Sequence, residues 1–220
     1  MQYNISEIYY SIQGEGASAG QPCIFVRFSG CNLRCKWCDT PYTSFSPEVN
    51  LLSFKQVCKK IDYLIKNYGV RYICFTGGEP SLYDLTPFTE KYKGYKLGIE
   101  SNGTLPIKGD FTEIVFSPKL KNSEQQKGYE KIAQQAGQNV KNYPNAIFKF
   151  VIRDKEDLDD ILLFCSANGI KRERVWLMPE GIKASQIRKR LPRIFTICKR
   201  YGFNLSSRLQ IFAWGNKRRK

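Results

Sequence analysis

The stretch CIFVRFSGCNLRCKWCDT, residues 23–40, joins a β-rich run to a loop that holds three closely spaced cysteines. Its first part, residues 23–28, is β-branched and aromatic, which predicts a strand. Cys31, Cys35 and Cys38 follow with the spacing C-x3-C-x2-C. Ligand sites of α/β proteins lie beyond the carboxyl ends of strands, so the stretch predicts a sheet with a site at its edge.

On both sides of this stretch, β-rich runs alternate with helical patterns. We predict strands over residues 5–10, 23–28, 70–75, 97–100, 114–116, 147–152, 175–178 and 209–214. Apolar spacing and capping residues predict helices between Ser53 and Gly69, over 83–92, between Asp154 and Gly169, and over 185–201. The alternation predicts an α/β fold with a mostly parallel sheet. Because 220 residues fall short of the ~250 of a full eight-stranded barrel, we expect one domain, residues 1–220, built as an open or partial (β/α) barrel.

Two segments stand apart from this alternation. Residues 122–143 are polar and rich in glutamine, and we interpret them as a surface insertion with a weak helical pattern around 129–136. The net charge is +15, of which residues 171–220 carry +13, including the basic tail 217–220. These charges are not interleaved with aromatic side chains, which favours a solvated basic face over direct nucleic-acid binding.

The composition excludes several kinds of site. The sequence contains no histidine, which excludes Ser-His-Asp and Cys-His triads, zinc sites with imidazole ligands and a histidine pH switch. The first residues lack the basic and apolar regions of a leader, and no apolar run approaches the ~20 residues that span a bilayer. We therefore expect a cytoplasmic protein without a membrane partner.

Eight cysteines are many for that compartment, where structural disulfides are rare. Five lie scattered in apolar stretches and are interpreted as core residues: Cys23, Cys58, Cys74, Cys165 and Cys198. The dense triplet Cys31, Cys35 and Cys38 instead predicts an iron–sulfur cluster, because such clusters are ordinarily held by cysteine thiolates. A zinc site would require a fourth ligand, and neither a fourth cysteine nor a histidine lies nearby. Three ligands on a four-iron cluster leave one iron open to bind another molecule.

A second motif, ICFTGGEP at residues 73–80, follows the strand predicted over 70–75. Two glycines at a strand end let the backbone approach a ligand closely, without a side chain in the way. Alone, the motif is equally compatible with a tight turn. Together with the three-cysteine loop, it favours a functional site.

With these two motifs the sequence resembles the radical S-adenosylmethionine superfamily. More narrowly, it is similar to the 7-carboxy-7-deazaguanine synthase family, whose motifs occur here in the expected order over most of the chain. They are SIQGEG at 11–16, FVRFSGCNLRCKWCDT at 25–40, FTGGEPSL at 75–82, ESNGT at 100–104, SPK at 117–119, FKFV at 148–151 and WGNKR at 214–218. The motif ESNGT departs from the common pattern, because Ser101 stands where threonine is common.

The resemblance implies that the open iron chelates S-adenosylmethionine and that an electron from the cluster cleaves it to a 5′-deoxyadenosyl radical. It implies a lyase that contracts 6-carboxy-5,6,7,8-tetrahydropterin to 7-carboxy-7-deazaguanine with loss of ammonia, a step toward queuosine and related 7-deazapurines. The protein then supplies binding, orientation and exclusion of water. A modified (β/α) barrel, a homodimer, Mg²⁺ and an electron donor such as flavodoxin or ferredoxin are implied as well.

Carried over by position, the resemblance also assigns site residues. S-adenosylmethionine would contact Trp37, Cys38, Asp39, Gly78, Glu79, Ser101, Ser117, Pro118 and Lys119. The pterin would contact Ile12, Gln13, Gly14, Glu15, Arg27 and Thr76. Glu15 would accept paired N–H donors of the ring, Arg27 would clamp the substrate carboxylate, and Thr40 would bind Mg²⁺. In some relatives the last carboxylate of the chain reaches the substrate, but this sequence ends in a basic tail, so Lys220 is not included.

Three other functions remain as alternatives. An activating enzyme that places a glycyl radical on a partner protein would need a docking surface and no pterin pocket. A nucleic-acid-binding protein would show tRNA binding with steep salt dependence, because phosphate contacts release counterions. An iron–sulfur redox sensor would fail to cleave S-adenosylmethionine when it is reduced.

Overall fold

A nine-stranded sheet forms the centre of the computed structural model, which describes residues 1–124 and 128–220. Across the sheet, the strands are β3 (Leu51–Ser53), β1 (Gln2–Ile12), β2 (Pro22–Phe28), β4 (Tyr72–Gly77), β5 (Lys96–Ser101), β6 (Glu113–Phe116), β7 (Ile147–Ile152), β8 (Val175–Pro179) and β9 (Asn204–Leu205). Strand β1 is antiparallel to both of its neighbours, and every pair from β2 to β9 is parallel. The predicted mostly parallel α/β sheet is confirmed.

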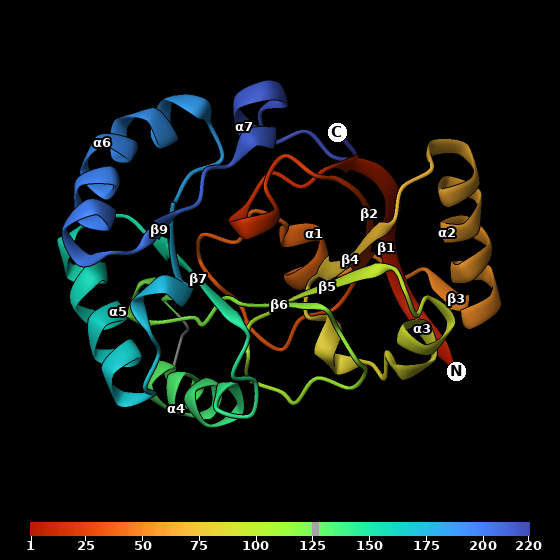
Figure 1. Cartoon of the computed structure of the whole chain (residues 1–220), viewed down its shortest axis with the longest axis horizontal. Helices are drawn as coiled ribbons and strands as arrows, with labels where there is room; N and C mark the ends of the chain where they lie inside the picture. Colours follow the sequence, from red (N-terminus) through yellow and green to blue (C-terminus); the bar gives the residue numbers. More distant parts are fainter. Residues whose placement is uncertain (125–127) are drawn as a thin grey trace.

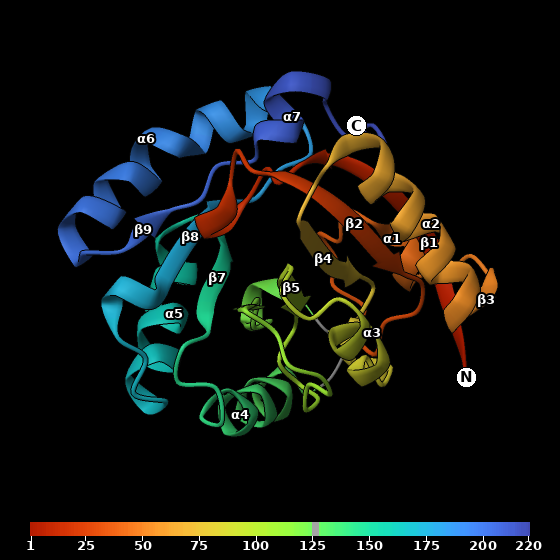
Figure 2. The same ribbon diagram turned by 45° about the vertical axis from the view of Figure 1, so that its right-hand side comes forward.

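Helices cover the outer side of the curved sheet, so that the strands form the inner wall of a ring (Figures 1 and 2). The outer helices are α2 (Phe54–Tyr68), α3 (Thr86–Lys91), α4 (Tyr129–Val140), α5 (Lys155–Ala167) and α6 (Ala184–Tyr201). Two short helices, α1 (Pro41–Ser44) and α7 (Leu209–Trp214), follow the three-cysteine loop and β9. None of the described helices combines the length and the apolar character needed to cross a membrane.

Local sequence signals set the ends of α2 and α5. Ser53 forms a capping box with Gln56, whose backbone N–H donates to Ser53 Oγ at 3.3 Å while its side chain accepts from Ser53 N at 2.8 Å. Gly69 ends α2 with φ of 66°, a conformation that glycine adopts without strain. Asp154 caps α5 by accepting from Asp157 N at 3.2 Å. The helix starts predicted from these residues are confirmed.

The two faces of each strand have different neighbours because successive side chains point to opposite sides. On β2, Ile24, Val26 and Phe28 belong to a hydrophobic core that also contains residues of α2 and α3. On the same strand, Phe25 and Arg27 face the inside of the ring, where they line a cavity. A second hydrophobic core lies between β6–β8 and helices α4–α6. The five cysteines predicted to be core residues are all buried.

Polar contacts replace a strand ladder where the ring would close. In the described part of the chain, β9 is an edge strand that pairs with neither β1 nor β3, so the barrel is partial. Leu209 N donates to Gly14 O at 3.0 Å, and Gly16 N donates to Ser206 Oγ at 2.9 Å. We call this junction between residues 13–16 and residues 206–210 the seam.

Two predictions from sequence are wrong in detail. Residues 209–214, predicted as a strand, form helix α7, because a six-residue apolar run has no periodicity that separates a strand from a short helix. Within 122–143, predicted as a surface insertion, α4 is the crossover helix between β6 and β7, and Ala136 and Val140 are buried in the second core. Residues 125–127 of this segment lie outside the described residues.

Phe148 tests the second core. It is 1 % exposed and its ring centre lies 6.0 Å from that of Phe116. We expect Phe148→Ala to lower the free energy of unfolding by about 3–5 kcal/mol, because the lost ring leaves a cavity. Phe195, which is 59 % exposed on α6, is the matched control, and Phe195→Ala should cost less than about 0.5 kcal/mol. Equal midpoints in urea unfolding would contradict the assignment of Phe148 to the core.

Candidate active site

A cavity of about 230 Å³ lies at the carboxyl ends of the parallel strands, inside the ring. Nearly all site residues predicted from sequence line it: Ile12, Gln13, Gly14, Glu15, Arg27, Cys31, Cys35, Trp37, Cys38, Asp39, Thr40, Thr76, Gly78, Glu79, Ser101, Ser117 and Lys119. Pro118 is the exception among the described residues, since it is buried beside Ser117 and Lys119 without lining the cavity. Lys220, which the sequence analysis left out of the site, does line it.

The three-cysteine loop follows β2 and forms one side of the cavity. Cys38 N donates to Cys35 O at 3.1 Å, which gives the loop a tight turn. Leu33 N donates to Cys31 Sγ at 3.4 Å, and Ser44 Oγ lies 3.3 Å from Cys38 Sγ. Burial raises the pKa of the Cys31 thiol to about 11. The loop therefore presents three sulfur atoms to one hollow.

The start of the polar segment 122–143 accepts hydrogen bonds from this loop. Trp37 Nε1 donates to Asn122 O at 2.7 Å, and Lys36 N donates to Ser123 O at 3.0 Å. Asn122 Nδ2 in turn donates to Val151 O on β7 at 2.8 Å. Asn122 and Ser123 thus join the three-cysteine loop to β7.

The glycines of GGEP lie against the three-cysteine loop. Gly78 N donates to Phe28 O at 3.0 Å, and Glu79 N donates to Gly30 O at 2.8 Å. A Cβ atom at Gly78 would overlap Gly30 O, and one at Gly77 would overlap the backbone of Phe28. Glycine is therefore required here because two backbones meet, in addition to the access to a ligand predicted from sequence.

Glu79 joins the turn after β4 to the end of β5. Its side chain is buried, and Oε1 accepts from Ser81 N at 3.0 Å and from Ser81 Oγ at 2.6 Å. Oε2 accepts from Asn102 N at 2.7 Å. Three donors therefore already fix this carboxylate at the wall of the cavity.

The wall continues from β5 to the turn after β6. Ser117 N donates to Ser101 O at 2.7 Å, and Lys119 Nζ donates to Ser117 Oγ at 2.6 Å. The ammonium of Lys119 lies 5.5 Å from the centre of the Trp37 ring, which is within the range of a cation–π contact. Apart from Pro118, the residues that the resemblance assigned to S-adenosylmethionine therefore form one connected side of the cavity.

Glu15 lines the same cavity at the seam. Its Oε2 accepts from Lys149 Nζ at 2.7 Å, and its Oε1 accepts from Arg208 Nε at 3.0 Å and from Gln210 Nε2 at 2.7 Å. Arg208 also pairs with Asp39 of the three-cysteine loop. Burial alone would raise the pKa of Glu15, but the charges of Lys149 and Arg208 outweigh it and hold this pKa well below its usual range.

A second carboxylate, Glu100, lines the cavity at the end of β5. Its Oε2 accepts from Thr76 Oγ1 at 2.9 Å. Its Oε1 accepts from Gln13 Nε2 at 3.3 Å and from Lys149 Nζ at 3.4 Å. Lys149 therefore stands between two carboxylates.

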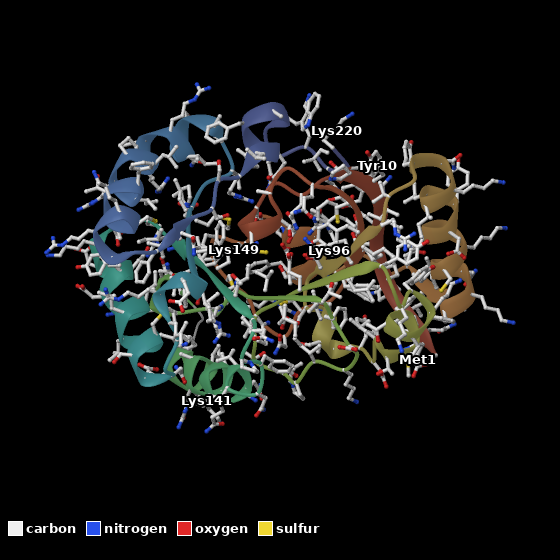
Figure 3. The ribbon with its side chains drawn as sticks, viewed as in Figure 1. Met1, Tyr10, Lys96, Lys141, Lys149 and Lys220 are labelled. Atoms are coloured by element: carbon white, nitrogen blue, oxygen red, sulfur yellow. The ribbon has the colours of Figure 1, made fainter. Side chains whose placement is uncertain are left out.

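The basic tail, residues 217–220, is exposed as predicted and folds back over α1 and β1. Arg218 pairs with both oxygens of Glu48 at 2.8 and 3.0 Å, and its Nε donates to Glu7 Oε1 at 2.8 Å. Its guanidinium lies 3.9 Å from the centre of the Tyr42 ring. Glu7 is buried and also faces Arg27 Nε at 3.4 Å. These contacts hold the tail at the rim of the ring. Lys220, its last residue, lines the cavity (Figure 3).

Comparison with known proteins shows which family has this sequence and fold. Residues 25–115 match the Radical SAM superfamily. The chain is 33% identical to the 7-carboxy-7-deazaguanine synthase of Pyrobaculum aerophilum over 98% of this chain and 96% of that protein. The chain belongs to the 7-carboxy-7-deazaguanine synthase family. The enzyme of that name from Escherichia coli K12 is 34% identical over 74% of this chain and 78% of its own length.

A solved structure gives the same fold. The crystal structure of QueE from Escherichia coli matches with a TM-score of 0.71 at 24% sequence identity, and the alignment covers 94% of each chain. The partial barrel expected from sequence is thus the fold of the 7-carboxy-7-deazaguanine synthase family. The same fold brings the three-cysteine loop and the seam to one cavity, where Arg208 pairs with both Glu15 and Asp39.

Membership of this family implies S-adenosylmethionine and a 4Fe-4S cluster, and the donor set fits both. Cys31, Cys35 and Cys38 line one cavity beside a connected polar wall. Among the described residues, no three Cys, Asp or Glu side chains are arranged to hold a single metal ion. Cysteine thiolates are the donors that iron–sulfur clusters take from proteins, so Cys31, Cys35 and Cys38 would hold the cluster.

The polar residues of the cavity that were not predicted as site residues include Lys149, Arg208 and Glu100. A signal for Lys149 was present, because a lone lysine in the apolar strand IFKFVI must face a cavity or a counter-charge. Arg208 gave no such signal, since it precedes a run predicted as a strand. Its place depends on the seam, which joins residues far apart in sequence.

Arg218 tests the docking of the tail. We expect Arg218→Ala to speed amide hydrogen exchange of residues 215–220 about fivefold, as losing about 1 kcal/mol of partly exposed ion pairing predicts. Lys217→Ala, which removes an exposed charge from the same tail, should leave exchange unchanged. Equal exchange in the two variants, measured by mass spectrometry, would show that the contacts of Arg218 do not hold the tail.

Proposed function

We propose that this chain converts 6-carboxy-5,6,7,8-tetrahydropterin to 7-carboxy-7-deazaguanine with loss of ammonia. The observation that carries the proposal is that one cavity combines a three-thiol loop with a polar side that contains Glu15 and Arg27. Relatives that bear the name of this activity over nearly the whole chain support the same reaction. The product would serve the synthesis of queuosine or another 7-deazapurine.

The cofactors would occupy the side of the cavity that faces the three-cysteine loop. Cys31, Cys35 and Cys38 would hold the cluster. S-adenosylmethionine would lie against Trp37, Cys38, Asp39, Gly78, Glu79, Ser101, Ser117 and Lys119. When bound, the reduced cluster supplies the electron that cleaves S-adenosylmethionine and begins radical chemistry on the substrate. The protein wall orients the reactants and keeps water away from them.

The pterin would occupy the side of the cavity that contains the seam, against Ile12, Gln13, Gly14, Glu15, Arg27 and Thr76. Arg27 Nη2 donates to Tyr9 OH at 3.2 Å, and Arg27 Nε lies 3.4 Å from Glu7 Oε2 without the geometry of a hydrogen bond. Its planar fork keeps donors for a substrate carboxylate. Glu15 is ionised, and its Oε2 has one donor, so it can accept an N–H of the ring.

Mg²⁺ belongs to the same proposal, with Thr40 as its protein ligand. The hydroxyls of Thr40 and Thr43 lie 3.4 Å apart beside Cys38, so hard oxygen donors border the cavity. Mg²⁺ keeps several waters and takes further ligands from its substrate, which suits a site with few protein ligands. An electron donor such as flavodoxin or ferredoxin, a homodimer and a cytoplasmic location also belong to the proposal.

Anaerobic turnover tests the reaction. Reconstituted and reduced protein is incubated with S-adenosylmethionine, Mg²⁺ and 6-carboxy-5,6,7,8-tetrahydropterin, and mass spectrometry follows the deazaguanine product. We expect product from the native chain and none from Cys35→Ala, which removes one cluster ligand. Cys165→Ala is the matched control, because Cys165 is a buried thiol on α5 outside the cavity. This variant should retain at least half of the native rate.

Each negative result points to a different function. Cleavage of S-adenosylmethionine without the deazaguanine product would keep the radical chemistry and reject the substrate. Transfer of a radical to a glycine of a partner protein would then be tested. No cleavage by a reduced, fully loaded protein would favour an iron–sulfur redox sensor.

Removing the metal tests the role of Thr40. We expect omission of Mg²⁺, with chelator present, to lower kcat/KM about tenfold or more, because substrate oxygens lose a positive partner. Thr40→Val should show the same loss at saturating S-adenosylmethionine, and its rate should no longer respond to Mg²⁺. A Thr40→Val variant with native Mg²⁺ dependence would reject this ligand.

A further inference from the structure

Lys149 is a buried cation that the proposed reaction does not yet use. It lies at the middle of β7, is 5 % exposed and lines the cavity inside the ring of strands (Figure 3). Its neighbours Phe148 and Phe150 point the other way, into the second core. A buried ammonium is tolerated only when charges and hydrogen bonds compensate it, so its partners define its role.

Those partners are two carboxylates from distant parts of the chain. Lys149 Nζ lies 2.7 Å from Glu15 Oε2 at the seam and 3.4 Å from Glu100 Oε1 on β5. Glu100 is further fixed by Thr76 and Gln13, as described above. One ammonium therefore sets the positions of both carboxylates that line this side of the cavity.

The other charges around Glu15 complete the arrangement. Arg208, just before α7, pairs with Glu15 and also with Asp39 of the three-cysteine loop, and Gln210 donates to Glu15 from α7. Burial would lower the pKa of Lys149, but Glu100 and Glu15 outweigh it and raise this pKa above its ordinary value. Lys149 thus stays protonated at neutral pH, which rules it out as a general base and makes it a fixed positive charge.

We infer that Lys149 is a positioning residue, whose ammonium holds Glu15 ionised and oriented to accept the N–H donors of the pterin and keeps Glu100 beside it. This inference rests on the proposed function. Two like-charged carboxylates in one cavity repel each other, and the ammonium between them removes that repulsion. It acts through Glu15 rather than by touching the reacting atoms.

The sign of the pH effect follows from these contacts. In the native chain the pKa of Glu15 lies below its value in an unfolded chain, so Glu15 accepts hydrogen bonds at every pH near neutrality. Without Lys149, burial and Glu100 both favour the neutral form of Glu15, while Arg208 and the hydrogen bond from Gln210 still oppose them. The pKa of Glu15 then rises, and pterin binding weakens further as the pH falls.

Pterin affinity tests the inference without turnover. Reconstituted holoprotein with an unreduced cluster, S-adenosylmethionine and Mg²⁺ is titrated anaerobically with 6-carboxy-5,6,7,8-tetrahydropterin at pH 8 and pH 6. We expect Lys149→Met to raise Kd about tenfold or more at pH 8, and by a larger factor at pH 6, relative to the native chain at the same pH. The ratio at each pH cancels the titration of the pterin itself.

Two further variants separate charge from packing. Lys149→Arg keeps the positive charge and should recover most of the affinity and the native pH profile. Lys141→Met, which removes an exposed lysine from the end of α4, is the matched control and should bind like the native chain. Lys149→Gln provides a second neutral variant if Lys149→Met does not fold, as judged by circular dichroism.

Each outcome of the titration supports or rejects the positioning role of Lys149. A native chain that fails to bind the pterin rejects the proposed function. A native chain that binds, together with a folded neutral variant of the same affinity at both pH values, overturns the inference about Lys149. Loss of affinity by the same factor at both pH values, or failure of both neutral variants to fold, would assign Lys149 to structure alone and would also overturn it.

Discussion

An ionised carboxylate away from water requires counter-charges, and Glu15 obtains them from two distant parts of the chain. Lys149 comes from β7 and Arg208 from the segment before α7. Breaking a buried pair of this kind costs about 3–5 kcal/mol, because the remaining charge is left uncompensated. The loop after β1, the inner face of β7 and the start of α7 are therefore held in one arrangement, and this arrangement forms half of the cavity.

Different parts of the fold supply the cofactor side and the substrate side of the cavity. The loops after β2 and β4 supply sulfur atoms, glycine backbone and the carboxylate of Glu79, which suits an iron–sulfur cluster and its ligand. The strands and the seam supply hard charged groups, which suit a polar heterocycle with a carboxylate. Arg208 connects the two sides, because it pairs with Glu15 and with Asp39 of the three-cysteine loop. A substitution at the seam that moves Arg208 therefore also changes the contact of Asp39, next to Cys38.

Features encoded within a few residues could be predicted from the sequence, and features that depend on distant contacts could not. The strand at residues 23–28, the caps at Ser53 and Asp154 and the three-cysteine loop are local patterns, and the structure has them where they were predicted. Residues 209–214 were predicted as a strand because a short apolar run gives no periodicity. The tail is exposed, as predicted, but its contacts with Glu7 and Glu48 could not be predicted because these partners lie 211 and 170 positions away.

The seam has a consequence for the order in which the chain folds. Its contacts join residues separated by 190 to 195 positions, such as Gly16 with Ser206 and Glu15 with Gln210. The entropy of closing so long a loop must be lost before these contacts stabilise anything, whereas β2, β4 and β5 pair over short separations. We therefore expect the half with the cysteines to form first and the seam last. A nascent molecule would keep its cysteine loop open to cluster delivery until the seam closes.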